Sequence, residues 1–388
     1  MKKSHLELLD FVSPVEKIDT GSKHTQLKAG MALCLSGGGY RAMLFHVGAL
    51  WRINEAGFLK KFDRISSVSG GSVTAAVLGM NWDKLDFDAK GIARQFVVRV
   101  VDPIRALAGT TLDISSVAEG MIMPGMTIND ALASSYRTHL FGNATLQDLP
   151  DHPRFVINAT NVQSGALWRF MKPYMADWRV GRITRPDVSL AAAVAASSAF
   201  PPFLSPMTLT LNHSAYTPKS GKDLQRKPFT TNVVLTDGGV YDNLGIETAW
   251  KLYDTILVSD GGGKMEPDPE PKRDWLMHYL RITDLIDNQV RNLRKGQVVD
   301  SFINGSRKGA YWGIRTNVKD YELADSLHCD FKKTMMLAHI STRMAELDSD
   351  TQERLINWGY AVCDAALRKH VNAALPRPDG FVYPKVKV

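Results

Sequence analysis

The chain has 388 residues, of which 44% are hydrophobic and 22% charged, as is typical of a globular protein with one large or two ordinary domains. Its three cysteines, Cys34, Cys329 and Cys363, are too few and too scattered for a disulfide framework or a metal cluster, which favours a reducing compartment. The net charge of +7 would suit an anionic lipid surface or a nucleic acid and selects neither.

The N-terminus offers no targeting signal that we recognise. Residues 1–30 form a polar lead-in with two early lysines but no apolar core of a signal peptide. No window approaches about 18 consecutive apolar residues, so we expect no transmembrane helix. These features predict a cytoplasmic protein.

The first glycine cluster follows a short apolar strand predicted over residues 31–35. The cluster is Gly37-Gly38-Gly39, and a helical pattern follows in which Leu44, Val47 and Leu50 share one face. Glycines before a helix leave backbone N–H groups free to point at negative charge, and the helix dipole adds to this effect. The cluster is a candidate anion-stabilising loop, although a tight packing turn would have the same sequence.

Ser69 follows the second predicted strand, residues 65–68, and precedes a predicted helix over residues 72–80. A serine at a sharp strand-to-helix turn is the mark of a nucleophile elbow, usually written G-x-S-x-G. Here Ser67 stands in place of the first glycine, so the match is loose, but both flanking positions are small. Ser69 is therefore the candidate nucleophile.

The middle of the chain is less regular. We predict a helix over residues 86–107, a pair of strands at 154–162 and 166–171, and a long polar surface insertion at 205–232. The methionine-rich run at 119–126 could form an apolar flap that touches lipid, although ordinary core packing explains each methionine as well.

Asp237 ends another apolar strand and begins the run Asp237-Gly238-Gly239. A carboxylate there could act as a base for a serine, provided that burial raises its pKa. Asp-Gly is also a common turn dipeptide. Asp260, at the end of the strand predicted over 254–259, is a rival with similar local chemistry. The histidines that follow Asp237 lie outside glycine-rich strand ends, which favours a Ser–Asp dyad over a triad.

Four blocks of this chain resemble the signature blocks of patatin-like phospholipases. They are Gly37-Gly38-Gly39-Tyr40-Arg41, Val68-Ser69-Gly70-Gly71-Ser72, Ala195–Phe203 and Asp237-Gly238-Gly239. The resemblance spans about residues 30–262 and implies a three-layer α/β/α fold with a mostly parallel central sheet. It also implies hydrolysis of fatty-acyl esters of phospholipids or other lipids by Ser69 and Asp237 through an acyl-enzyme, with Asp237 preferred over Asp260.

The resemblance assigns the remaining site residues as well. Gly37, Gly38 and Gly39 would form the oxyanion hole, and Arg41 would either neutralise a substrate phosphate or fix the loop. The implied partners are an acyl lipid and, transiently, a membrane surface; no metal, cofactor or nucleic acid is expected. We divide the chain into the lead-in 1–30, a catalytic domain 31–263 and a mainly helical region 264–388 packed on the same domain.

Two alternatives remain open at this stage. Residues Gly37 to Ala42 also satisfy the dinucleotide fingerprint G-x-G-x-x-G/A. That fingerprint requires an acidic residue at the end of the second strand, where this chain has Ser69. The other alternative is a lipid-binding scaffold that keeps the pocket without turnover.

After the catalytic blocks, two long helices are expected. One is basic and amphipathic, over residues 275–299, and the other is a closing helix over residues 350–374, followed by Pro376 and Pro378.

Overall fold

The computed structural model describes residues 27–112, 128–202, 204–342 and 344–388. The methionine-rich run at 119–126 and most of the predicted lead-in lie outside these ranges. The strands are β1 (Lys28–Leu35), β2 (Arg64–Val68), β3 (Arg154–Asn161), β4 (Ala166–Phe170), β5 (Tyr174–Asp177), β6 (Gly181–Thr184), β7 (Met207–Thr210), β8 (Asn232–Asp237), β9 (Tyr253–Asp260) and β10 (Lys308–Gly313). The helices are α2 (Gly39–Glu55), α3 (Gly70–Met80), α4 (Asp102–Ala108), α6 (Ile128–Tyr136), α7 (Leu190–Ser197), α8 (Gly239–Asp242), α9 (Glu247–Trp250), α10 (Trp275–Ile303), α11 (Phe331–Ala338) and α12 (Ser349–His370).

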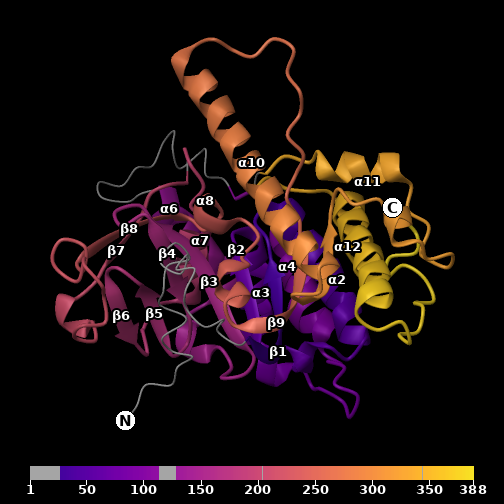
Figure 1. Ribbon diagram of the computed structural model, residues 1–388, viewed down its shortest axis with the longest axis horizontal. Coiled ribbons are helices and arrows are strands. Elements are labelled where there is room, and N and C mark those ends of the chain that lie inside the picture. The colour runs from indigo at the N-terminus through magenta and orange to yellow at the C-terminus, as the bar shows by residue number, and fades with distance from the viewer. Residues whose placement is uncertain (1–26, 113–127, 203, 343) are drawn as a thin grey trace.

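One mixed sheet runs through the protein in the order β10-β9-β1-β2-β3-β4-β5-β6 (Figure 1). The strands from β10 to β3 are parallel to their neighbours. Strands β4, β5 and β6 follow as an antiparallel extension. Parallel strands are joined through helices, which cover the faces of the sheet. The predicted α/β class with a mostly parallel central sheet is confirmed.

Alternating side chains of strand β1 contribute to two different cores. On β1, Leu33 and Leu35 join the large core with α2, α3, α7 and α12, whereas Ala32 and Cys34 join a smaller one. This smaller core also contains residues of β9 and Val298 of α10. Because successive side chains of a strand point to opposite faces, the helices form two layers with the sheet between them.

Two sequence predictions were wrong in detail. Residues 86–95 are not helical; they form turns and a short bridge between Phe87 and Ala93, and helical structure begins only at Phe96. The Asp88 carboxylate accepts hydrogen bonds from the amides of Lys90 and Ile92, which favours a turn over a helix. The segment 205–232 is more ordered than predicted, because it contributes β7, which pairs antiparallel with β8.

No helix in the described ranges has an apolar stretch long enough to cross a bilayer.

Candidate active site

Strand β3 brings Ser69 and Asp237 together. On one side, β3 pairs first with β2 and then, further along its length, with β8. The last residue of β2, Val68, pairs with Asn158 in parallel. The last residue of β8, Asp237, pairs with Ala159, the next residue of β3, in antiparallel register. The two strands thus run toward each other and end at adjacent positions. Residues that follow either end must share one small region of the sheet edge.

Ser69 occupies a strained backbone turn between β2 and α3. Its φ of 51° and ψ of −122° lie in a region that residues other than glycine rarely adopt. The turn is tight: a side chain on Gly70 would collide with the carbonyl oxygen of Gly39, and one on Gly71 would lie 2.5 Å from the carbonyl oxygen of Leu35. Small residues are therefore required on this side of the serine, as in a nucleophile elbow.

Ser197, at the end of α7, connects the Ser69 turn to the end of β8 through hydrogen bonds. Its hydroxyl accepts the amide hydrogen of Ser69 (3.0 Å) and donates to the carbonyl oxygen of Asn158 (2.6 Å). Its own carbonyl oxygen accepts the Gly238 amide (3.3 Å). Sequence reasoning marked the surrounding block, but it assigned no role to this serine.

The Asp237 carboxyl is buried, with 2% of the residue exposed. Burial raises its pKa from 3.8 to about 7, and the charge of Asp287 also raises it. Hydrogen bonds from the Gly239 amide (2.7 Å) and from the Ser69 hydroxyl act in the opposite direction. The dominant cause is desolvation, which penalises the charged form. A carboxylate of this kind is far more basic than one in water.

The glycine loop lies beside the serine. A side chain on Gly37 would come within 3.2 Å of the Ser69 Cβ. The Gly37 amide already donates to the carbonyl oxygen of Asn243 (3.0 Å). The amides of Gly38 and Gly39 have no acceptor among the described residues. Gly38 has a φ of 141° and is the N-cap of α2, and Gly39 is its first residue, so both amides belong to the unpaired N-terminal turn of a long helix.

Two buried side chains fix this loop and its surroundings. Arg41 donates to the carbonyl oxygens of Gly261 (3.1 Å) and Ile340 and to the hydroxyl of Thr342 (3.1 Å). His46 contacts the Ser36 carbonyl oxygen (2.9 Å). Burial lowers the pKa of His46 to about 4, so it is neutral at physiological pH. Each guanidinium nitrogen of Arg41 already has an acceptor in the protein, an arrangement that suits a loop-fixing role better than phosphate capture.

Asp260, the rival carboxylate, is engaged elsewhere. Its two oxygens accept hydrogen bonds from the Tyr311 hydroxyl (2.7 Å) and the Gly262 amide (2.8 Å). Although burial raises its pKa, the charge of Arg291 and the Tyr311 hydrogen bond bring the pKa below its ordinary value. Asp260 is thus a stably ionised group that holds β9 and β10 together, in contrast to Asp237.

A cavity of about 330 Å³ opens over these residues. Ser69, Asp237 and the loop residues Gly37 and Gly38 lie in its floor, together with Arg41. Its walls come from the loop after β9, from α10, from the end of α11 with the segment after it, and from single residues after α7 and α8. The lining residues are Phe200, Asn243, Gly262, Gly263, Lys264, Met265, Asp284, Asp287, Asn288, Arg291, Ala338, His339, Ile340, Ser341 and Thr342.

The sequence profile of one family, described as patatin-like phospholipase, matches residues 33–250. This range is more than half of the chain and contains Ser69, Asp237 and the glycine loop. The protein belongs to the patatin-like phospholipase family. A search of curated protein sequences gave no match.

Several solved structures are similar to this chain at low sequence identity. Human GIVD cytosolic phospholipase A2 is 14% identical over 68% of this chain and 52% of its own, with a TM-score of 0.39. VipD from Legionella pneumophila is 16% identical over 89% of this chain and 67% of its own, with a TM-score of 0.36. The type III effector protein ExoU is 13% identical over 88% of this chain and 53% of its own, with a TM-score of 0.31. This chain thus spans about half of two of these proteins.

Proposed function

We propose that this patatin-like protein is a serine acyl hydrolase of the phospholipase A or lysophospholipase type, which cleaves fatty-acyl esters of phospholipids or related lipids. The observation that carries the proposal is the meeting of the Ser69 elbow with a buried carboxyl whose pKa is raised to about 7, below one cavity. Family membership supports the lipid substrate class.

In the proposed reaction Asp237 takes the proton of the Ser69 hydroxyl as its oxygen attacks the ester carbonyl carbon. The carbonyl oxygen becomes an oxyanion, and the amides of Gly38 and Gly39 stabilise it. The bond to the alcohol then breaks, and protonated Asp237 returns its proton to the leaving alcohol. Asp237 next deprotonates a water molecule, whose oxygen attacks the acyl carbon of the acyl-enzyme. As the bond between this carbon and the Ser69 oxygen breaks and the fatty acid leaves, Asp237 returns the proton to the Ser69 oxygen. These steps use only this chain's residues and water.

Arg41 enters the proposal as a positioning residue for the glycine loop, because its contacts join α2 to Gly261 and to the segment after α11. The dinucleotide alternative gains no support from the described residues, since β2 ends in the strained Ser69 turn and not in a carboxylate. We expect the protein to act on lipids at a membrane surface, to which its net charge of +7 contributes attraction.

The proposal is tested with Ser69→Ala, Asp237→Asn and the double variant, assayed on a soluble short-chain ester and on phospholipid vesicles. Each single change should reduce kcat by roughly 10³-fold or more, and the double variant should be no worse, because the two side chains act as one unit. Independent, multiplicative losses would contradict the dyad.

A fluorophosphonate probe followed by mass spectrometry supplies a readout that does not depend on the substrate chosen. We expect the probe on Ser69 in the native protein and on no serine in Ser69→Ala. A label on a different serine would move the nucleophile elsewhere and overturn the proposal.

A further inference from the structure

Helix α10 (Trp275–Ile303) is 29 residues long and stands out from the body of the protein (Figure 1). Its C-terminal half is anchored: Arg294 lies 3.7 Å from Glu247, and the Lys295 ammonium lies 4.8 Å from the ring centre of Tyr311. Val298 and Ser301 are its only buried residues. The N-terminal half projects beyond these contacts, and residues 275–279 are all exposed.

The two sides of the projecting helix differ in chemistry. One side carries six large apolar or aromatic side chains at spacings of three and four residues, which place them on one face. We call this set the α10 stripe: Trp275 (81% exposed), Tyr279 (63%), Ile282 (40%), Ile286 (60%), Val290 (41%) and Leu293 (66%). The opposite side carries Asp284, Asp287, Asn288 and Arg291, which line the cavity. The cavity wall and the stripe therefore belong to the same helix.

We propose that the α10 stripe is the surface by which this protein binds a lipid bilayer, an inference that rests on the proposed lipid substrate. A row of exposed apolar side chains costs free energy in water and marks an interaction surface. Tryptophan and tyrosine at the projecting end are the residues favoured at the boundary between head groups and acyl chains. Lys272 and Arg273, both exposed, lie just before Trp275 and suit anionic head groups.

Neighbouring elements favour a bilayer over a single partner helix. Phe200 (40% exposed) lines the cavity, Val240 (53%) follows the Asp237 loop on α8, and Met336 (70%) lies on α11. Helices α8 and α11 lie at the same end of the molecule as the projecting part of α10 (Figure 1). A second helix packed along the stripe would cover α10 alone, whereas a lipid surface can meet all three elements.

Helix α10 spans the distance between its projecting end and the cavity. Trp275 and Arg291 are 16 positions apart on one helix, which corresponds to about 24 Å along its axis. A single helix therefore joins the end that enters the lipid to the wall of the cavity.

The test compares Ile282→Asn/Ile286→Asn with Ile303→Asn as the matched control. Ile303 is 79% exposed on the same helix but lies outside the stripe. Both sets are made in the Ser69→Ala background, so that hydrolysis does not consume the lipid. Binding to vesicles of equal parts phosphatidylcholine and phosphatidylglycerol should weaken about tenfold or more in the double variant and stay unchanged in the control. Unchanged binding in the double variant would overturn the proposal.

Trp275 provides a direct probe of insertion. All eight tryptophans lie in the described ranges, and the other seven are buried or half-buried. Vesicles with brominated acyl chains should quench part of the fluorescence, and Trp275→Phe should remove that part while it preserves binding. Quenching that persists in Trp275→Phe would show that another element enters the lipid.

Two further outcomes are separable. If sedimentation without lipid shows that the parent chain is a dimer and the double variant a monomer, the stripe is a self-association surface and the lipid proposal is wrong. If the parent chain binds vesicles through the stripe but hydrolyses neither soluble nor vesicle esters, the proposed function fails and this inference stands. The soluble-ester assay on the stripe variants with Ser69 restored should give the parent rate, because the stripe residues do not line the cavity.

Discussion

Two carboxyl groups at the ends of strands in the same sheet have pKa values that are shifted in opposite directions. Asp237 is desolvated and accepts one backbone amide, so its pKa rises to about 7. Asp260 is equally buried, but Arg291 and Tyr311 lower its pKa below the ordinary value. Such a divergence commonly separates a catalytic group from a structural one. At the residue scale, electrostatics favour Asp237 as the base.

The pH profile of the soluble-ester assay should follow the ionisation of Asp237. Asp237 must be ionised to accept the proton of Ser69, so kcat/KM should rise with pH and level off above about 7. Below that value it should fall about tenfold per pH unit. A rate that stays constant from acid to neutral pH would mean that the base is a carboxylate with an ordinary pKa.

Asp237 should also reduce stability at the pH where it works. Its folded pKa of about 7 exceeds the ordinary 3.8, so the folded protein holds a proton that the unfolded chain has released. Because the folded protein binds this proton more tightly than the unfolded chain does, protonation favours the folded state. This contribution to stability is fully present below about pH 4 and is lost as the pH rises through about 7. Asp237→Asn keeps an oxygen for the Gly239 amide and carries no charge.

Urea unfolding of the parent chain and of Asp237→Asn at acid and alkaline pH measures this effect. We expect Asp237→Asn to have a free energy of unfolding about 1–3 kcal/mol higher than the parent chain at pH 8 and about equal to it near pH 4. Ser69→Ala serves as a control that removes the reaction and keeps the charge. A loss of stability in Asp237→Asn at pH 8 would show that the carboxylate has a structural role that this electrostatic account omits.

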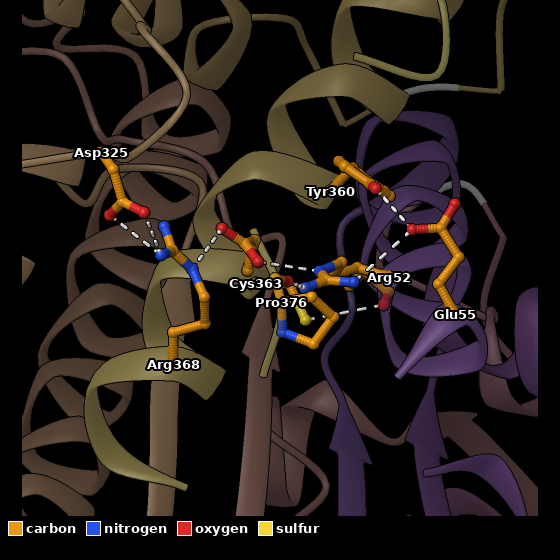
Figure 2. A network of polar contacts seen from close by, with 9 residues as sticks. Arg52, Glu55, Asp325, Tyr360, Cys363, Arg368 and Pro376 are labelled. Carbon is orange, nitrogen blue, oxygen red and sulfur yellow. Dashed lines mark hydrogen bonds and ion pairs between the residues drawn. The ribbon is translucent and has the colours of Figure 1, made fainter. Parts of the chain in front are cut away.

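At the scale of elements, helices α2 and α12 pack closely together, and this contact supports the glycine loop at the start of α2. Gly48 lies against the Ile356 carbonyl and Gly359 against the Phe45 carbonyl, and a side chain on either glycine would collide with the facing backbone. A polar network flanks the contact (Figure 2), in which Arg52 binds Asp364 at 2.8 Å. The helix that begins at the glycine loop is thus fixed by the last helix of the chain.

The network extends beyond this pair in both directions (Figure 2). Asp364 also accepts from Arg368 (3.0 Å), which in turn binds Asp325 (2.8 Å). At the other end Tyr360 donates to Glu55. Arg52 and Asp364 are both buried, so loss of Arg52 would leave the Asp364 carboxylate with Arg368 as its ion-pair partner, and loss of Asp364 would leave Arg52 with the longer contact to Glu55 (3.6 Å).

Gly359→Ala tests the helix contact. The added methyl group must push α12 away from α2, so we expect the free energy of unfolding to fall by about 1–3 kcal/mol. Gly296→Ala is the matched control, because Gly296 lies in α10 with nothing within 4 Å of the added carbon; it should be neutral or stabilising by up to about 1 kcal/mol. Equal effects of the two changes in thermal or urea unfolding would contradict the close contact.

The sequence predicts individual elements here better than it predicts how they pair. Strand-glycine-helix patterns around Gly37 and Ser69 depend on local sequence, and both predictions agree with the structure. The approach of β8 to β2 along β3 depends on register between distant segments, which no local pattern encodes. The same reason explains β7: its alternation of buried and exposed residues is short, and its partner β8 lies beyond a polar stretch.

At the scale of the whole molecule, the chain after Gly263 shares the sheet and the core of the segment before it. Strand β10 pairs in parallel with β9 along its whole length. Helix α12 buries Trp358 in the large core, where its indole N–H donates to the Ile314 carbonyl oxygen (2.8 Å). The segment after α11 also supplies Ile340 and Thr342, which accept hydrogen bonds from Arg41. Residues far from the family blocks therefore shape the cavity.

We therefore expect that residues 1–263 alone do not fold into an active protein, because α2 would expose the apolar face that α12 covers. A milder change, Trp358→Ala in the full chain, should keep the fold and lower the free energy of unfolding by about 3–5 kcal/mol, since it leaves a large cavity and an unpaired carbonyl. Cooperative unfolding of the 1–263 fragment, with ester hydrolysis at the parent rate, would contradict this expectation. If the fragment is insoluble, the Trp358→Ala measurement still tests the expectation. A decrease in the free energy of unfolding below about 1 kcal/mol would mean that α12 contributes little to the core, although Trp358, Ile356 and Leu355 are buried there.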